Sequence, residues 1–113
     1  MSEIELTAEE VAPQTQLIDF EDAELIAMEP PPVGFALRVR GQVPCLNMVV
    51  RLVPVRYIRE PEYWAIQVLG DLQGGVCLTA VRDFDEALVQ PPMGTKGIVV
   101  VGESKRLSIE KPL

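Results

Sequence analysis

The sequence predicts an all-β protein, a small antiparallel β-sandwich of immunoglobulin-like architecture. Three observations support this prediction. Apolar and polar residues alternate with period two beyond residue 34, and turn-forming residues recur at intervals of about eight to twelve residues. No segment has the periodicity of an amphipathic helix. A small β-barrel fits the same pattern and is the alternative architecture. With 113 residues, of which 48% are hydrophobic, the chain is long enough for one buried core.

Charge divides the chain into an acidic leader and a nearly neutral remainder. Residues 1–30 contain nine of the 17 acidic residues and none of the ten basic ones, so the leader has a net charge of −9 and the remainder +2. Three consecutive prolines follow and favour an extended connector. We expect residues 1–22 to be an acidic, partly disordered arm. Residues 23–113 then form a single domain, in which 23–32 supply a first strand and the connector.

Two strands are expected on either side of these prolines. Residues 23–28 alternate Leu25 and Ala27 with Ile26 and Met28, the pattern of a strand that covers an otherwise open sheet edge. The next strand, residues 34–45, has an apolar face and a basic face. Its apolar positions are Phe35, Leu37, Val39, Val43 and Cys45, and its polar face contains Ala36, Arg38, Arg40 and Gln42.

The sequence also predicts two hairpins. In the first, residues 59–62 form the turn, so that Ile58 lies opposite Tyr63 and Tyr57 opposite Trp64. Pro54 has no N–H to donate, which indicates an edge or a bulge at that position.

In the second hairpin, residues 103–106 form the turn and Val100 pairs with Ile109. Together with a strand after Gly74 and Gly75, the region beyond residue 34 offers about six strands.

Two cysteines, Cys45 and Cys77, lack the spacing of a metal or redox motif, and the chain has no histidine to join them as a ligand. We expect free core thiols, with a disulfide as the alternative. No apolar run reaches the roughly 18 residues of a membrane-spanning helix, and the first residues do not resemble a signal peptide. A cytoplasmic protein without membrane attachment is therefore expected.

The residues offer little for catalysis. Without histidine the chain lacks the commonest general base, and it contains no glycine-rich phosphate loop. No catalytic residue and no cofactor is predicted. Asp83, Asp85 and Glu86 form the best carboxylate cluster, so a small carboxylate-based enzyme, or a β-barrel binding a ligand or divalent cation there, is the alternative function.

The favoured function is that of a non-enzymatic protein–protein interaction or structural module. Its contact surfaces would be the acidic arm and the arginine-bearing sheet face, and its partner another protein or a second copy. The candidate partner-binding residues are Leu17, Ile18, Phe20, Arg38, Arg40, Arg56, Arg59 and Tyr63. Nucleic acid is not expected, because a chain with a pI near 4.5 repels phosphates.

Overall fold

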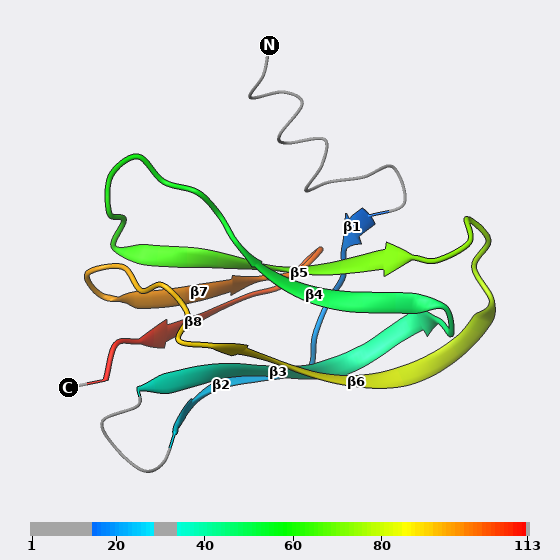
Figure 1. The fold of residues 1–113 in the computed structure, drawn as a ribbon, viewed down its shortest axis with the longest axis horizontal. Coiled ribbons are helices and arrows are strands. Elements are labelled where there is room, and N and C mark those ends of the chain that lie inside the picture. The colour runs from blue at the N-terminus through cyan, green and yellow to red at the C-terminus, as the bar shows by residue number, and fades with distance from the viewer. Residues whose placement is uncertain (1–14, 29–33, 113) are drawn as a thin grey trace.

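In the computed structural model the chain forms two β-sheets that pack face to face (Figure 1). The structure describes residues 15–28 and 34–112. Within these ranges there is no helix and neither sheet closes into a barrel, which confirms the predicted β-sandwich. The strands are β1 (Thr15–Leu17), β2 (Asp22–Ala27), β3 (Phe35–Cys45), β4 (Met48–Pro54), β5 (Tyr63–Leu72), β6 (Thr79–Val89), β7 (Gly97–Val101) and β8 (Arg106–Glu110).

The larger sheet is organised around β5. One edge of β5 pairs with β4, and the other edge pairs with β7 along residues 63–67 and with β1 along residues 69–71. Strand β8 continues the sheet beyond β7. The β5–β7 pair is parallel and the other pairs are antiparallel, so the sandwich is not antiparallel throughout.

The smaller sheet consists of β2, β3 and β6, with β3 in the centre and every pair antiparallel. Strand β2 confirms the strand expected at residues 23–28, and β3 confirms the alternation read from residue 34. Leu37, Val39 and Val43 are at most 1% exposed, because they point toward the other sheet. The proline-rich connector lies outside the described residues.

The predicted register of the first hairpin is wrong by one residue. With Ile58 opposite Tyr63, Pro54 would lie opposite Gln67, but it pairs with Ile66. Strand β4 ends there, so residues 55–62 form a longer connection than the expected four-residue turn. Ile58 was expected in the strand but is fully exposed in this connection. The edge position of Pro54 is confirmed, because in the described part of the chain β4 pairs only with β5 and ends at this residue. Tyr57 lies beyond β4 and does not form the expected strand pair with Trp64, although the two rings meet edge to face with centroids 5.3 Å apart.

The second hairpin differs from its predicted register by two residues. Val100 pairs with Leu107, not Ile109, and the turn is closed by a hydrogen bond from the Gly102 N–H to the Lys105 carbonyl oxygen (2.8 Å). Side chains alternate with period two along a strand, so a two-residue shift keeps each residue on its predicted face. Ile98 and Val100 accordingly are fully buried.

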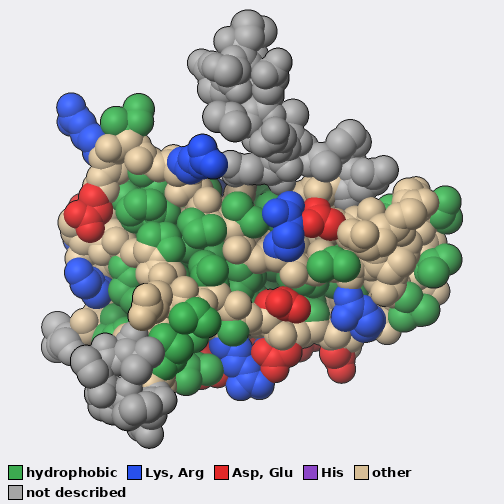
Figure 2. All heavy atoms as spheres, in the orientation of Figure 1, with side chains coloured by type: hydrophobic (Ala, Val, Ile, Leu, Met, Phe, Trp, Pro, Cys, Tyr) green, Lys and Arg blue, Asp and Glu red, His purple; other side chains and the backbone are tan. Residues whose placement is uncertain are grey.

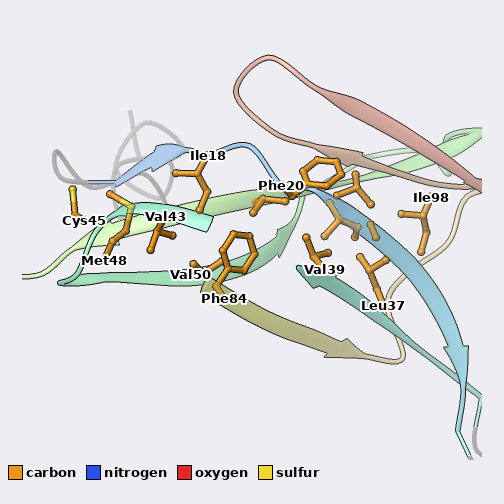
Figure 3. Packing of buried hydrophobic residues seen from close by; sticks show 14 residues of the cluster. Ile18, Phe20, Leu37, Val39, Val43, Cys45, Met48, Val50, Phe84 and Ile98 are labelled. Atoms are coloured by element: carbon orange, nitrogen blue, oxygen red, sulfur yellow. The ribbon is translucent and has the colours of Figure 1, made fainter. Parts of the chain in front are cut away.

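The core lies between the two sheets and includes residues from the predicted arm. Its largest fully buried side chains are Leu37, Ile66, Ile98, Val39, Val43, Val68 and Val100. Ile18 and Phe20 are each 4% exposed and project into this same cluster (Figure 3). The sequence placed Ile18 and Phe20 in a partly disordered arm as partner contacts, whereas the structure places both in the core. The arm's first 14 residues lie outside the described part of the chain.

Residues 18–21 cross from the larger sheet to the smaller one and are fixed at both ends. The Ile18 N–H donates to the Val68 carbonyl oxygen (3.0 Å), and the Glu21 N–H donates to that of Arg40 (2.8 Å). The Lys105 ammonium group lies 4.9 Å from the Phe20 ring centroid and donates to the Phe20 carbonyl oxygen (3.0 Å). This crossover, residues 18–21, is therefore an integral part of the sandwich.

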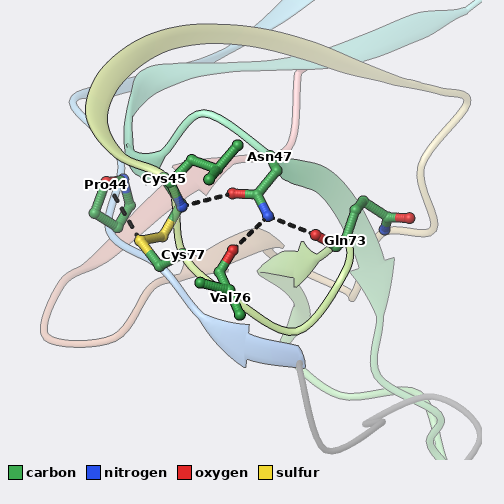
Figure 4. The surroundings of a disulfide bond; sticks show 7 residues. Pro44, Cys45, Asn47, Gln73, Val76 and Cys77 are labelled. Atoms are coloured by element: carbon green, nitrogen blue, oxygen red, sulfur yellow. Dashed lines mark hydrogen bonds between the residues drawn. A yellow bond between two sulfur atoms is a disulfide. The ribbon is translucent and has the colours of Figure 1, made fainter.

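Cys45 and Cys77 form a disulfide, so the expectation of free thiols is wrong (Figure 4). The bond joins the end of β3 to the connection between β5 and β6, with Cα atoms 5.2 Å apart. Alternation along β3 placed Cys45 correctly in the core, but Cys77 lies in a loop whose position depends on tertiary structure. The described part of the chain contains no helix with the length and hydropathy needed to cross a bilayer.

Candidate functional site

The outer face of the smaller sheet carries the most regular polar arrangement in the described part of the chain. Side chains alternate between the two faces of each strand. Ala23, Val39 and Phe84 are buried in the core, so the residues on either side of them point outward. We call this surface the charged face. It consists of Asp22, Glu24, Arg38, Arg40, Gln42, Asp83 and Asp85. Figure 2, which views the sandwich from its side, shows acidic and basic side chains together along this edge of the molecule.

Strand register explains the pairing on the charged face. Asp22, Arg40 and Asp85 occupy one row across the three strands. Arg40 forms an ion pair with Asp22, while Arg38 reaches diagonally to Asp85 with two hydrogen bonds, Nε to Oδ1 at 2.9 Å and Nη2 to Oδ2 at 2.5 Å. Two-point contacts of this kind hold a guanidinium and a carboxylate in a defined orientation.

These contacts keep the carboxylates ionised. The hydrogen bond from Arg38 lowers the pKa of Asp85, and that from Arg40 lowers the pKa of Asp22. The pKa of Arg38 is raised, with the hydrogen bond to Asp85 as the main cause. A general acid needs a carboxyl group whose pKa is raised toward neutrality. The shifts have the opposite direction, so the geometry does not favour acid–base catalysis on this face.

The charged face has more acidic than basic residues. Its two arginines stand beside four carboxylates, Asp22, Glu24, Asp83 and Asp85, so its net charge is −2. A shallow depression of about 520 Å³ opens among these residues. Its lining consists of Glu21, Asp22, Arg40, Gly41, Asp83, Phe84 and Asp85. The sequence indicated an arginine-bearing face, and the strands added on either side of it make that face acidic.

The predicted metal cluster does not come together. Asp83 and Asp85 lie on the charged face. Glu86 follows Asp85 directly on β6 and pairs with Val39, so it lies on the other side of the sheet. Gln42 donates a hydrogen bond to Asp83 (3.1 Å), and Asp85 is held by Arg38. Among residues 15–28 and 34–112, no group of three or more histidine, cysteine or acidic side chains is arranged to hold a metal ion.

Three other predicted contact residues belong to a different part of the molecule. Arg56 and Arg59 lie in the connection between β4 and β5, and Tyr63 begins β5 on the outer face of the larger sheet. Tyr63 donates a hydrogen bond to Glu110, which raises the pKa of the tyrosine. The two sheets face each other through the core, so Tyr63 and Arg38 lie on opposite outer surfaces.

The arm residues proposed as partner contacts face inward or are half-buried. Ile18 and Phe20 fill the core, and Leu17 pairs with Leu69 on β1 and β5. Sequence analysis missed Asp22 and Glu24 as members of the charged face, because it assigned Asp22 to the arm. The alternation of apolar and polar residues could have identified them, because Asp22 and Glu24 alternate with Ala23 and Leu25 and so lie on the opposite face of the strand.

Comparison with protein-family models, with curated proteins and with solved structures finds no match for this chain.

Proposed function

We propose that this protein is a non-enzymatic interaction module whose charged face binds a basic surface of a partner protein. One observation carries the proposal. Four carboxylates and two arginines stand in register on a regular three-stranded sheet, around a depression whose lining has four acidic residues and one basic residue. Such a site is complementary to a cationic side chain or segment.

The fixed geometry of the face supports this function. Asp22 and Asp85 are held by ion pairs, so they lose little side-chain freedom when a partner arrives. Residues 1–14 add four glutamates and no lysine or arginine, and we propose them as a second contact surface for the same basic partner. Charge complementarity of this kind accelerates association at low salt and is screened at high salt.

The carboxylate-based enzyme and the divalent-cation site have no comparable support. Both relied on Asp83, Asp85 and Glu86, and β6 directs Glu86 to the other side of the sheet from the two aspartates. Binding of nucleic acid is disfavoured by the net negative charge of the face, which repels phosphates.

The disulfide also bears on the compartment in which the protein works. Disulfides persist in oxidising environments and are rare in the cytosol. The Cys45–Cys77 bond therefore supports an oxidising compartment over the cytoplasm expected from the sequence.

A labelled oligolysine peptide tests the charged face directly. We expect the protein to bind this probe at low salt, and more weakly as salt is raised. The double substitution Asp83→Asn, Asp85→Asn should weaken binding several-fold, because it removes two carboxylates from the depression and leaves the strands intact. Deletion of residues 1–14 should weaken it further. A longer deletion is unsuitable, because Ile18 and Phe20 belong to the core.

The matched control is Glu60→Gln, Glu103→Gln, which removes the same charge from two exposed positions in connections. This control should bind the peptide as the wild type does. Equal loss in the control and in the charged-face variant would show a general charge effect and refute the proposal. No binding at any salt concentration would refute it as well.

A further inference from the structure

Two segments at one end of the sandwich contain no charged residue, and the Arg82 guanidinium reaches this end only to donate a hydrogen bond to the Met48 carbonyl oxygen. Residues 41–50 and 72–81 contain no acidic or basic residue, although 24% of the chain is charged. They form the end of β3, the start of β4 and the connection from β5 to β6, which meet at the same end of the molecule (Figure 1). The contrast with the charged face indicates a different kind of surface.

Large aliphatic side chains are exposed at this end. Leu46, Val76 and Leu78, which we call the apolar tip, are 50%, 68% and 54% exposed. Leu46 and Leu78 are neighbours, since the Leu46 N–H donates to the Leu78 carbonyl oxygen (2.9 Å). Val49 and Val81 flank the tip and are also exposed. Hydrophobic side chains gather at this end in the space-filling view (Figure 2).

The tip is held rigidly from beneath. The Asn47 side-chain amide donates to the carbonyl oxygens of Gln73 (2.5 Å) and Val76 (2.7 Å), and its oxygen accepts from the Leu78 N–H (3.0 Å). The disulfide fixes Cys77 beside the exposed Val76 (Figure 4), and the exposed Leu78 follows it in the sequence. A loop ordered in advance loses little conformational entropy when it binds. Exposed apolar side chains on a rigid support are typical of a contact surface.

We propose that the apolar tip is a self-association surface, and that its partner is the tip of a second copy of this chain. A two-fold dimer brings the same patch of both copies together, so the patch must complement itself. An uncharged patch does so, whereas the charged face of one copy would repel that of another. Homodimer interfaces are also more apolar than transient interfaces between different proteins.

Net charge points to the same end of the molecule. Each copy carries −7, so association at the apolar tip keeps the acidic residues of the two copies apart. A bilayer fits the tip less well. Residues 41–50 and 72–81 contain no tryptophan, tyrosine, lysine or arginine, the residues that anchor proteins at membrane interfaces.

Sedimentation equilibrium of the full chain over a range of concentrations tests this proposal. The wild type should form a dimer reversibly. Val76→Glu should raise the dissociation constant about tenfold or more, because it places two like charges in the apolar contact. Reduction of the disulfide should also weaken the dimer. The control Ile58→Glu introduces the same charge at a fully exposed position in the β4–β5 connection and should leave the dimer unchanged.

Thermal unfolding of each variant confirms that these surface changes leave the fold intact. A wild type that stays monomeric at every concentration would overturn the proposal, as would an equal effect of Ile58→Glu and Val76→Glu. Cosedimentation of a monomeric protein with phosphatidylcholine vesicles would show that the tip binds lipid instead. Asp83→Asn, Asp85→Asn should not affect the dimer, so the result is separate from that for the charged face.

Discussion

The carboxylate of Asp19 accepts two hydrogen bonds from Ser104, one from the backbone N–H at 2.7 Å and one from the hydroxyl group at 2.5 Å. Asp19 belongs to the crossover and Ser104 to the turn between β7 and β8, and 85 residues separate them in the sequence. The pKa of Asp19 is lowered, with the hydrogen bond from the Ser104 side chain as the largest cause. The pair fastens the N-terminal crossover to the last hairpin.

A double-mutant cycle measures this pair. Asp19→Ala removes both hydrogen bonds and should lower the melting temperature by a few degrees. Ser104→Ala removes only the bond from the hydroxyl group and should have the smaller effect. The double variant should be no less stable than Asp19→Ala alone, because the hydroxyl has lost its acceptor. Additive effects in thermal unfolding would show that the two side chains act independently.

The crossover should contribute to the core through Ile18. We expect Ile18→Ala to lower the free energy of unfolding by about 2 to 5 kcal/mol, the usual cost of a cavity left by a buried isoleucine. Ile58→Ala is the same substitution at a fully exposed position and should have almost no effect. Urea unfolding of both variants gives the comparison. Similar losses at the two positions would contradict the burial of Ile18.

Reduction of the disulfide should destabilise the protein. The bond closes a loop with a sequence separation of 32, which corresponds to roughly 3 to 4 kcal/mol if the gain comes from the entropy of the unfolded chain. Urea unfolding with and without reductant measures the difference. The double variant Cys45→Ala, Cys77→Ala should not respond to reductant. A wild type that is equally stable under both conditions would argue against the bond.

Stability at low pH should depend on Asp71. Its partial burial raises the pKa, but the hydrogen bonds from Arg51 and Thr15 outweigh that effect. The pKa of Asp71 in the folded protein therefore lies below its ordinary value of 3.8. A lowered pKa in the folded state adds stability that is fully present above 3.8 and is lost as the pH falls through the folded value. Asp71→Asn should therefore be less stable at neutral pH and lose less stability on acidification.

The measurement is the midpoint of urea unfolding at neutral pH and at several acidic values. Glu60→Gln, at an exposed loop position, is the control and should follow the wild type. Parallel curves for Asp71→Asn and the wild type would show that Asp71 does not contribute to the acid sensitivity.

Local pattern predicted the strands better than their pairing. The alternation of β3 and the edge position of Pro54 could be predicted because each depends on a residue and its immediate neighbours. The β4–β5 register could not, because two turn lengths give plausible apolar pairs and tertiary packing selects between them. The parallel pairing of β5 with β7 depends on a strand 30 or more residues away, so no local signal marks it.

In the candidate site, too, the features that depend on neighbouring residues could be predicted and those that depend on tertiary structure could not. Alternation along β3 correctly placed Arg38 and Arg40 together on one face. The acidic character of that face comes from β2 and β6, which lie on either side of β3 only in the folded protein. Asn47 escaped notice because its three partners come from a loop some 30 residues further along the chain.

The crossover also constrains how the protein is made. Asp19 leaves the ribosome long before Ser104, and β1 pairs with β5 residues that follow it by more than 50 positions. During translation, Ile18 and Phe20 therefore have no complete core to enter until these later strands have been made. We expect nascent chains to need protection by chaperones through most of their synthesis, and folding to be slow, as it is for other proteins dominated by long-range contacts.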